Sequence, residues 1–292
     1  MSMKLRAAIV ILIPACLLAA SNRTRPVPSA KSSSKQSAVR AHTYLGFDRN
    51  NYPGDAALPS LRKTFSFAGY WLNEPPGATS NAWMGKRAIL SHRGFGFLVL
   101  FNGRTYSQLR TPSQPAALGA TDARVAARNA AREGFPRNTI IFLDQEEGGR
   151  LLREQRSYLF AWIDGVIAAG FRAGIYCSGM PASEGNGKFV VTADDIHDHA
   201  EGRSISFFVY NDACPSSPGC VYPQEPPSPT RSGVPFASIW QFAQSPRRHE
   251  FTARCSSTYS RDGNCYPPVA AGAGSIFVDL DSATSPDPSG GR

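Results

Sequence analysis

The sequence carries little charge and lacks the short motifs of several enzyme classes. Charged residues make up only 18% of its 292 positions. It contains no Cys-x-x-Cys pair, and its five histidines are scattered, so the ligand spacing of a zinc site is missing. The Gly-x-Ser-x-Gly turn of serine esterases and any recognisable nucleic-acid-binding module are also absent. We therefore expect no metal, no cofactor and no nucleic-acid partner, and a polysaccharide deacetylase or an esterase is disfavoured.

The N-terminal apolar segment is too short to span a bilayer comfortably. Lys4 and Arg6 precede the apolar residues 7–20, whereas a transmembrane helix needs about 20 apolar residues. Small residues follow, as they do at a signal-peptidase site. Residues 1–20 are thus interpreted as a signal peptide, which predicts export to the periplasm or the cell exterior. Cys16 leaves a lipid anchor as the less favoured alternative and as the only expected contact with a membrane.

Positive charge is in excess. Removal of residues 1–20 would lower the formal charge from +9 to +7, because that segment contains two basic residues and no acid. An exported cationic protein is attracted to anionic polymers. We therefore expect a cell-wall polysaccharide or another anionic glycan as the partner of a monomeric protein.

The cysteine spacing is typical of an oxidising compartment. Cys214 and Cys220 lie in one loop rich in proline and glycine, and Cys255 and Cys265 lie in another. Both spacings favour local disulfides, Cys214–Cys220 and Cys255–Cys265. Cys177 lies in an apolar strand and is expected to be a buried free thiol.

The chain is divided into a polar tether at residues 21–42, a folded domain at 43–283 and a disordered polar tail at 284–292. Strands are predicted at residues 44–50, 65–72, 94–102, 139–147, 171–178, 205–211, 237–243 and 275–281. Helices are predicted at 55–63, 81–92, 121–133, 150–169 and 192–201, the third of them capped by Thr121 or Asp122. Strands that alternate with helices indicate a parallel sheet. Eight such units favour an α/β fold, a single-domain (β/α)8 TIM-type barrel with long disulfide-stapled loops late in the chain, over a doubly wound sheet.

The segment 139–147 begins as an apolar run and ends in carboxylates. Strand residues i and i+2 share a face, so Asp144 and Glu146 should point one way, and Gln145 and Glu147 the other. Two neighbouring carboxylates perturb each other's pKa, which suits acid catalysis. The structural alternative is a strand end whose acids pair with surface arginines.

Other polar and aromatic residues occupy the predicted C-terminal ends of strands, where barrels of this kind place their active sites. Besides Asp48 and the two acids above, the candidates for substrate binding are Trp71, Asn102, Tyr176, Tyr210, Trp240, Gln241 and Asp279. Acids, amides and aromatic rings are the residue types that sugar sites need. Each also has a structural explanation: Asp48 could cap a helix, and the aromatic residues could be packing. Asp281 is interpreted as the cap of a final turn.

These residues form a recurring pattern: Gly46-Phe-Asp48, Leu143-Asp-Gln-Glu146, Gly174-Ile-Tyr176, Ile239-Trp-Gln241 and Val278-Asp279. The pattern resembles the glycoside-hydrolase-like domain family of unknown function in exported bacterial proteins, which is related to the family 25 muramidases, the Chalaropsis-type lysozymes. The resemblance covers roughly residues 43–283.

The resemblance implies that Glu146 is the general acid, that Asp144 and Asp48 are its carboxylate partners, and that Tyr210 is the tyrosine of the sixth strand. The chain departs from the muramidases directly after Asp48, where Arg49-Asn50-Asn51 replaces a turn containing Ser and Gln. We expect an exported glycoside hydrolase acting on peptidoglycan-like cell-wall glycan. The alternative is a non-catalytic glycan-binding module on the same fold.

Overall fold

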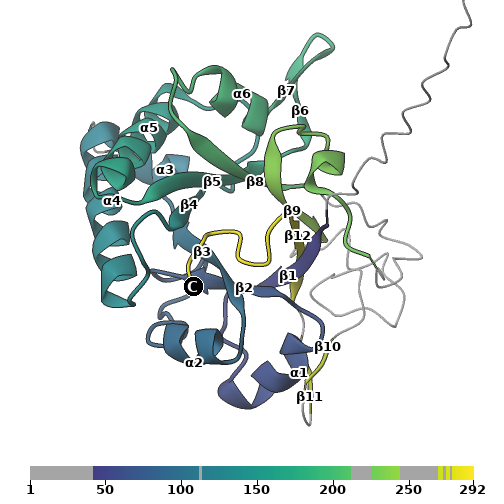
Figure 1. Cartoon of the computed structure of the whole chain (residues 1–292). Coiled ribbons are helices and arrows are strands. Elements are labelled where there is room, and N and C mark those ends of the chain that lie inside the picture. The colour runs from purple at the N-terminus through teal and green to yellow at the C-terminus, as the bar shows by residue number, and fades with distance from the viewer. Residues whose placement is uncertain (1–41, 112–113, 212–224, 244–268, 272–273, 277) are drawn as a thin grey trace, which may run out of the picture. The chain divides into compact units, whose positions relative to one another are not determined.

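The computed structural model describes residues 42–111, 114–211, 225–243, 269–271, 274–276 and 278–292. Their central feature is a closed barrel of eight strands in the order β1-β12-β9-β8-β5-β4-β3-β2 (Figure 1). The strands are β1 (Tyr44–Asp48), β2 (Phe67–Trp71), β3 (Gly96–Asn102), β4 (Ile140–Asp144), β5 (Arg172–Ser178), β8 (Ile205–Tyr210), β9 (Ala237–Ala243) and β12 (Asp279–Ala283). The expected α/β barrel is confirmed at this level.

The barrel is mixed, which corrects the expectation of a wholly parallel sheet. Neighbours from β1 through β2, β3, β4, β5 and β8 to β9 are parallel, but β12 runs antiparallel to both β1 and β9. The predicted strand 275–281 spans two elements. Gly274–Ile276 (β11) pairs with Val269–Ala271 (β10) in a separate sheet, and β12 begins at Asp279. Because β12 is reversed, its first residue lies at the end of the barrel where the other strands finish.

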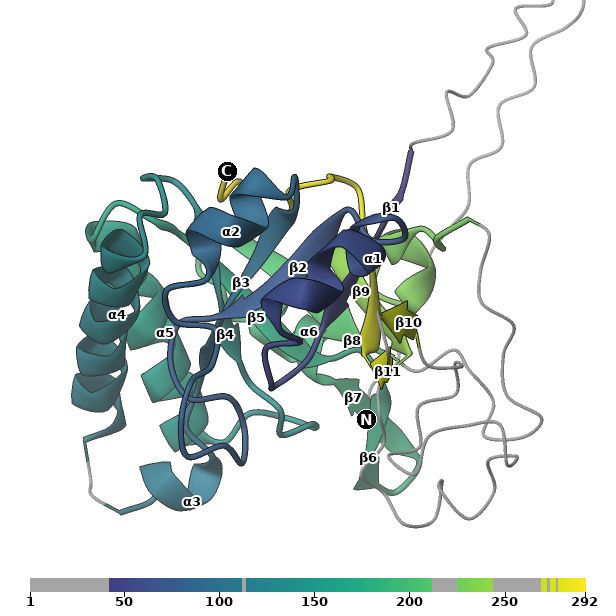
Figure 2. The same ribbon diagram turned by 90° about the horizontal axis from the view of Figure 1, so that it is seen from below.

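Helices cover the outside of the barrel (Figure 2). They are η1 (Asp55–Ala57), α1 (Leu58–Arg62), α2 (Arg87–His92), α3 (Tyr106–Leu109), α4 (Pro115–Arg132), α5 (Arg153–Ala168), α6 (Thr192–Asp198) and η2 (Pro229–Ser232). The predicted cap at Thr121 or Asp122 is wrong, because α4 starts at Pro115. Arg104 donates to the buried Asp122 at 2.6 Å and Tyr158 donates at 2.9 Å, so this acid joins α4 to α5 and to the loop after β3.

A β-hairpin that the sequence analysis did not predict projects from the barrel between β5 and α6 (Figure 1). It consists of β6 (Pro181–Gly185) and β7 (Lys188–Val191). Asn186 and Gly187 at its tip both have positive φ, 50° and 73°, which is the geometry of a type I′ turn. Glu184 joins the hairpin to the loop after β4 through two hydrogen bonds from Arg150, at 2.6 and 3.0 Å.

Residues 284–292, expected to be a disordered tail, lie instead against the starts of β3 and β4. Ser289 is buried, and its hydroxyl accepts a hydrogen bond from Val99 N at 2.8 Å. Its carbonyl accepts one from Ile140 N at 2.8 Å, and Asp287 accepts one from Phe97 N at 2.8 Å. The segment supplies partners that the first residues of these strands would otherwise lack. It therefore covers the end of the barrel opposite to the carboxylates described below.

Several expectations fall outside the described residues. The signal peptide, the tether up to residue 41 and the cysteines at 214, 220, 255 and 265 are among them. Cys177 is described, and it is buried and free as expected. None of the helices in the described part of the chain combines the length and the apolar character that a bilayer crossing requires.

Candidate functional site

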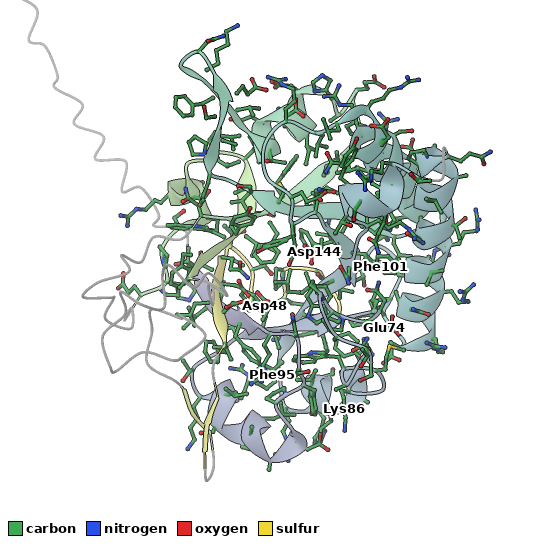
Figure 3. All side chains as sticks on the ribbon, turned by 180° about the vertical axis from the view of Figure 1, so that it is seen from behind. Asp48, Glu74, Lys86, Phe95, Phe101 and Asp144 are labelled. Carbon is green, nitrogen blue, oxygen red and sulfur yellow. The ribbon has the colours of Figure 1, made fainter. Side chains whose placement is uncertain are left out.

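Three strands bring aspartates to one end of the barrel. Asp48 and Asp144 are the last residues of β1 and β4, and Asp279 is the first residue of β12, directly paired with Asp48. Asp48 and Asp144 are only 6% and 5% exposed, and Figure 3 shows both near the centre of the barrel. The expected meeting of acids from separate strands is thus present. Asp279 reaches this end because β12 is antiparallel, and not because it ends a parallel strand.

A glycine on the neighbouring strand makes room for Asp48. A Cβ atom on Gly69 of β2 would lie 2.5 Å from the Asp48 Cβ atom, which is far closer than carbon atoms pack. Glycine at this position therefore allows the Asp48 carboxylate to enter the barrel interior.

A relay of hydrogen bonds crosses the interior from β5 to β1. The Tyr176 hydroxyl donates to Gln241 Oε1 at 2.7 Å, and Gln241 Nε2 donates to Asp48 Oδ2 at 2.7 Å. Gln241 is 3% exposed, so both bonds are shielded from water. The relay orients Asp48 and gives its ionised form a donor. Gln241 was expected to bind substrate, and in the structure its amide oxygen and one amide N–H bond to these two partners.

Burial perturbs the aspartates. It raises the pKa of Asp48 from 3.8 to about 6, although the Gln241 hydrogen bond and a contact with Asp281 act in the opposite direction. Burial also raises the pKa of Asp144 well above its usual value, and the charges of Glu146 and Asp48 add to this. Asp144 Oδ1 is buried and has no hydrogen-bond partner among the described residues. Protonation is the physical means by which such an oxygen avoids the cost of a buried charge.

Glu146 and Glu147 lie beyond the strand, which corrects the predicted strand 139–147, because β4 ends at Asp144. Glu146 is exposed and lies close enough to Asp144 for its charge to affect the pKa of that residue. Glu147 turns toward the outer helices, where its Oε2 accepts hydrogen bonds from Tyr106 N at 2.7 Å and Gln155 Nε2 at 2.6 Å. The two glutamates therefore have different surroundings, as expected, although the cause is a loop and not strand alternation.

Two tyrosines line the same interior as the acids. The rings of Tyr176 and Tyr210 lie 5.5 Å apart, and the Tyr210 hydroxyl donates to the Glu146 carbonyl at 3.3 Å. Burial and the surrounding charges, that of Asp144 first, raise the pKa of Tyr176 well above its usual value. Tyr210 thus helps to hold the backbone of Glu146 beside the cluster of aspartates.

The remaining predicted residues have structural partners. Trp71 donates its indole N–H to Arg49 O at 3.2 Å. Asn102 donates to Glu74 O at 2.8 Å and so ties the loop after β2 to the end of β3. Trp240 precedes Gln241 and thus lies on the opposite face of β9, where it packs 5.8 Å from Phe242. The structure therefore does not place the Trp240 side chain on the face of β9 that carries Gln241, and its role in substrate binding stays a prediction.

Sequence reasoning misjudged one interior acid. Asp281, interpreted as the cap of a final turn, lies inside β12 opposite Gly46 and Gln241 and is fully buried. The alternation Asp279-Leu280-Asp281 is the signal that could have placed it inside the barrel. Within the described residues, no group of three or more His, Cys, Asp or Glu side chains has the geometry to hold a metal ion.

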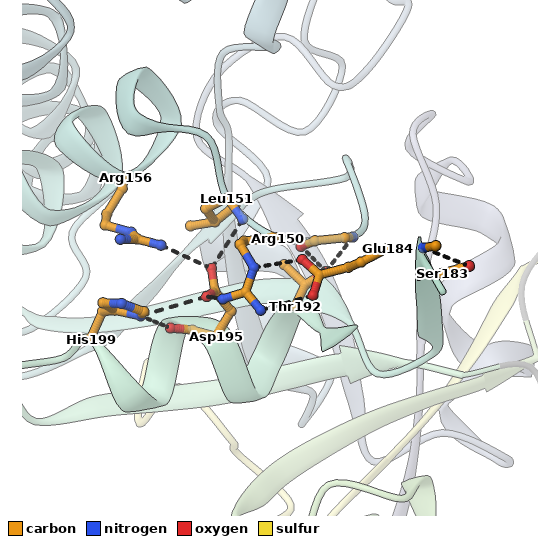
Figure 4. Close-up of polar contacts among 10 residues, drawn as sticks. Arg150, Leu151, Arg156, Ser183, Glu184, Thr192, Asp195 and His199 are labelled. Carbon is orange, nitrogen blue, oxygen red and sulfur yellow. Dashed lines mark hydrogen bonds and ion pairs between the residues drawn. The ribbon is translucent and has the colours of Figure 1, made fainter. Parts of the chain in front are cut away.

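A second polar cluster, outside the barrel, holds the loop that carries Glu146 (Figure 4). Asp195 of α6, with a side chain 1% exposed, accepts from Leu151 N at 3.0 Å and pairs with Arg150 at 3.1 Å and Arg156 at 3.4 Å. Thr192 Oγ1 accepts from Gly149 N at 2.8 Å. Sequence reasoning missed this cluster, because its partners are more than 30 residues apart.

The part of the chain that contains β4, its acidic loop and β5 can be compared with known families. Residues 72–206 match the Rv2525c-like, glycoside hydrolase-like domain family. The resemblance predicted from the sequence is thereby confirmed. The match includes Asp144 and Glu146, whereas Asp48, Gln241 and Asp279 lie outside it. No curated protein sequence matches this chain.

Solved structures similar to this chain have low sequence identity. An uncharacterized B. stearothermophilus protein is 16% identical with a TM-score of 0.51, over 82% of this chain and 95% of that one. The Mycobacterium tuberculosis Tat-secreted protein Rv2525c, in complex with L-tartrate, is 16% identical with a TM-score of 0.48, over 84% and 97%. A family 25 glycosyl hydrolase from Bacillus anthracis is 10% identical with a TM-score of 0.42, over 83% and 89%. The first of these supports the barrel fold.

Proposed function

We propose that the protein is an exported glycoside hydrolase acting on bacterial cell-wall glycan of the peptidoglycan type. The observation that carries the proposal is the convergence of Asp48, Asp144 and Asp279 at one end of a closed barrel, beside an exposed Glu146. Glycosidic bond cleavage uses two carboxyl groups, one to protonate the leaving oxygen and one to stabilise the positive charge that develops on the sugar. The family match over residues 72–206 supports this reaction class.

Each acid receives a role from its surroundings. Glu146 is exposed and thus accessible to a large substrate, and we assign it the role of general acid. Asp144, which is buried and feels the charges of Glu146 and Asp48, either stabilises the oxocarbenium-like transition state or orients the N-acetyl group of the substrate for attack. Asp48, fixed by Gln241, supplies a second negative charge to the same region. The export signal predicted from residues 1–20 and the excess of positive charge support a cell-wall substrate.

Incubation of the purified protein with a panel of glycans tests the proposal. The panel should include purified peptidoglycan, chitin oligosaccharides and a neutral glucan, with products identified by mass spectrometry. We expect soluble fragments from peptidoglycan, and their release should be at least about 10²-fold slower when Glu146→Gln replaces the wild-type protein. If the wild-type protein binds peptidoglycan in a pull-down but releases no fragment, the glycoside-hydrolase function is excluded. The non-catalytic glycan-binding module is then the function that remains.

A further inference from the structure

Within the part of the chain that the structure describes, Asp281 has no donor that could stabilise its charge. Its side chain is fully buried, and no hydrogen-bond donor among the described residues reaches either carboxylate oxygen. An isolated carboxylate at such a position loses the favourable free energy of its hydration and gains no hydrogen bond in return. The titratable groups that face it are Asp48 from β1 and Asp279 from β12, and both are acids. The ionised form of Asp281 is therefore destabilised both by burial and by repulsion from these two acids.

Asp48 is in a different position, although it is almost as buried. Gln241 Nε2 donates to its Oδ2 at 2.7 Å, and Gln241 is itself held by Tyr176. A hydrogen bond to the charged form favours that form. Asp48 and Asp281 are also in side-chain contact, and two carboxyl groups can form a hydrogen bond only when one of them is protonated.

We propose that Asp48 and Asp281 share one proton, which resides on Asp281 and is donated to Asp48, so that the pair carries a single negative charge on Asp48. In this arrangement Asp281 is a positioning residue for the reaction. Protonated Asp281 gives Asp48 a second hydrogen-bond donor, in addition to Gln241 Nε2. The proton also limits the negative charge that Asp144 experiences. The catalytic part of this role rests on the proposed glycosidase activity, whereas the shared proton does not.

Carboxyl carbon NMR on the wild-type protein tests the proton directly. With aspartates labelled at the carboxyl carbon and assigned, we expect the Asp281 signal to keep the position of a protonated acid from pH 5 to pH 7. The Asp48 signal should move with a midpoint near pH 6, following the rise that burial gives its pKa. Titration of Asp281 near pH 4, like that of an exposed aspartate, would overturn the proposal.

Unfolding equilibria provide a second test that needs no substrate. If the folded protein binds one proton that is released on unfolding, the equilibrium constant for unfolding increases about tenfold for each unit by which the pH is raised. Asp281→Asn keeps a donor toward Asp48 but removes this proton, so its slope between pH 5 and 7 should be lower by about one factor of ten per pH unit. Asp55→Asn is the control, because Asp55 is exposed and its pKa lies below the usual value. Equal slopes in wild type and Asp281→Asn would overturn the shared proton.

A cation bound between the acids would neutralise them without a shared proton. Such a cation would raise the melting temperature of the wild type on addition of calcium chloride, and this outcome would also contradict the proposal. If peptidoglycan is cleaved, Asp281→Ala should lower kcat more than Asp281→Asn does, because only asparagine restores the donor to Asp48. Intact proton linkage without glycan cleavage would leave the shared proton standing and reject the proposed function instead.

Discussion

Gln241 donates a hydrogen bond of 2.7 Å to Asp48 across 193 residues of sequence. The bond joins β9 to β1 inside the barrel, although these strands are not neighbours in the sheet, since β12 lies between them. The oxygen of the same amide accepts a hydrogen bond from the Tyr176 hydroxyl, so the Gln241 side chain orients both Asp48 and Tyr176. The Gln241 hydrogen bond favours the ionised form of Asp48 and so opposes the rise in pKa that burial causes.

Gln241→Met should shift the pH dependence of glycan cleavage. The pKa of Asp48 is about 6 while Gln241 donates to it, and this donation lowers the value. Without the donor the pKa of Asp48 rises, so a larger fraction of Asp48 is protonated at a given pH. In the wild type we expect kcat/KM to fall about tenfold per pH unit below pH 6, and in Gln241→Met the fall should begin at a higher pH. The pH–rate profile is the measurement, and the exposed Gln114→Met is the control.

Glu146→Gln should reduce the cleavage rate by about 10²–10⁴-fold, since it removes a transferable proton with little change in shape. Glu147→Gln is the matched control. Glu147 accepts hydrogen bonds from Tyr106 N and Gln155 and faces away from the aspartates, so its amide variant should retain most of the activity. Single-turnover rates on a soluble peptidoglycan fragment separate chemistry from binding. An essential Glu147 beside a dispensable Glu146 would refute the assignment of the acid.

Asp195→Asn should loosen the loop that carries Glu146. Asp195 is buried against Arg150, Arg156 and Leu151 N, and breaking a buried ion pair typically costs about 3–5 kcal/mol. The outer arginines are partly exposed, so we expect about 2–3 kcal/mol here, together with a fall in kcat that exceeds any rise in KM. Asp198→Asn, on the same helix and 76% exposed, is the control. Denaturant unfolding and steady-state kinetics provide the two readouts. An unchanged kcat would show that Asp195 contributes to stability but does not position Glu146 for the reaction.

Ser289→Ala should destabilise the barrel from the end opposite to the acids. The Ser289 hydroxyl accepts from Val99 N in a fully buried position, so alanine leaves a strand N–H without a partner. Such a loss costs about 1–3 kcal/mol. Thr284→Ala, at an exposed position of the same segment, should change the free energy of unfolding by less than about 0.5 kcal/mol. Chemical denaturation of both variants is sufficient, and equal stabilities would show that the C-terminal segment is not part of the folded unit.

The disulfides Cys214–Cys220 and Cys255–Cys265 remain a prediction from sequence spacing and the export signal. Non-reducing peptide mapping of protein recovered from the periplasm or culture medium should show both pairs and a free Cys177. Burial raises the pKa of the Cys177 thiol, which disfavours its reactive thiolate form. A mapped bond between Cys177 and either loop would contradict the pairing.

The sequence by itself determined the α/β barrel class, the approximate positions of the eight barrel strands and most of the acids. Apolar runs such as Ile140–Leu143 and Gly96–Phe101 can be recognised without a structure, because burial on both faces leaves little freedom in composition. Asp48 and Asp144 were found because polar residues at the ends of such runs are unusual. The family resemblance was likewise visible in short motifs, each of two to four neighbouring residues, which are spread along the chain from Gly46 to Asp279.

Only the tertiary structure decided the direction of β12, the interior position of Asp281 and the partners of Gln241. Strand alternation tells which residues share a face, but it does not tell which way a strand runs beside its neighbours. The ordered segment 284–292 and the Asp195 cluster were hidden for a related reason. Their polar side chains resemble solvent-exposed ones in the sequence, and only the partners brought from distant segments show that they are buried and hydrogen-bonded.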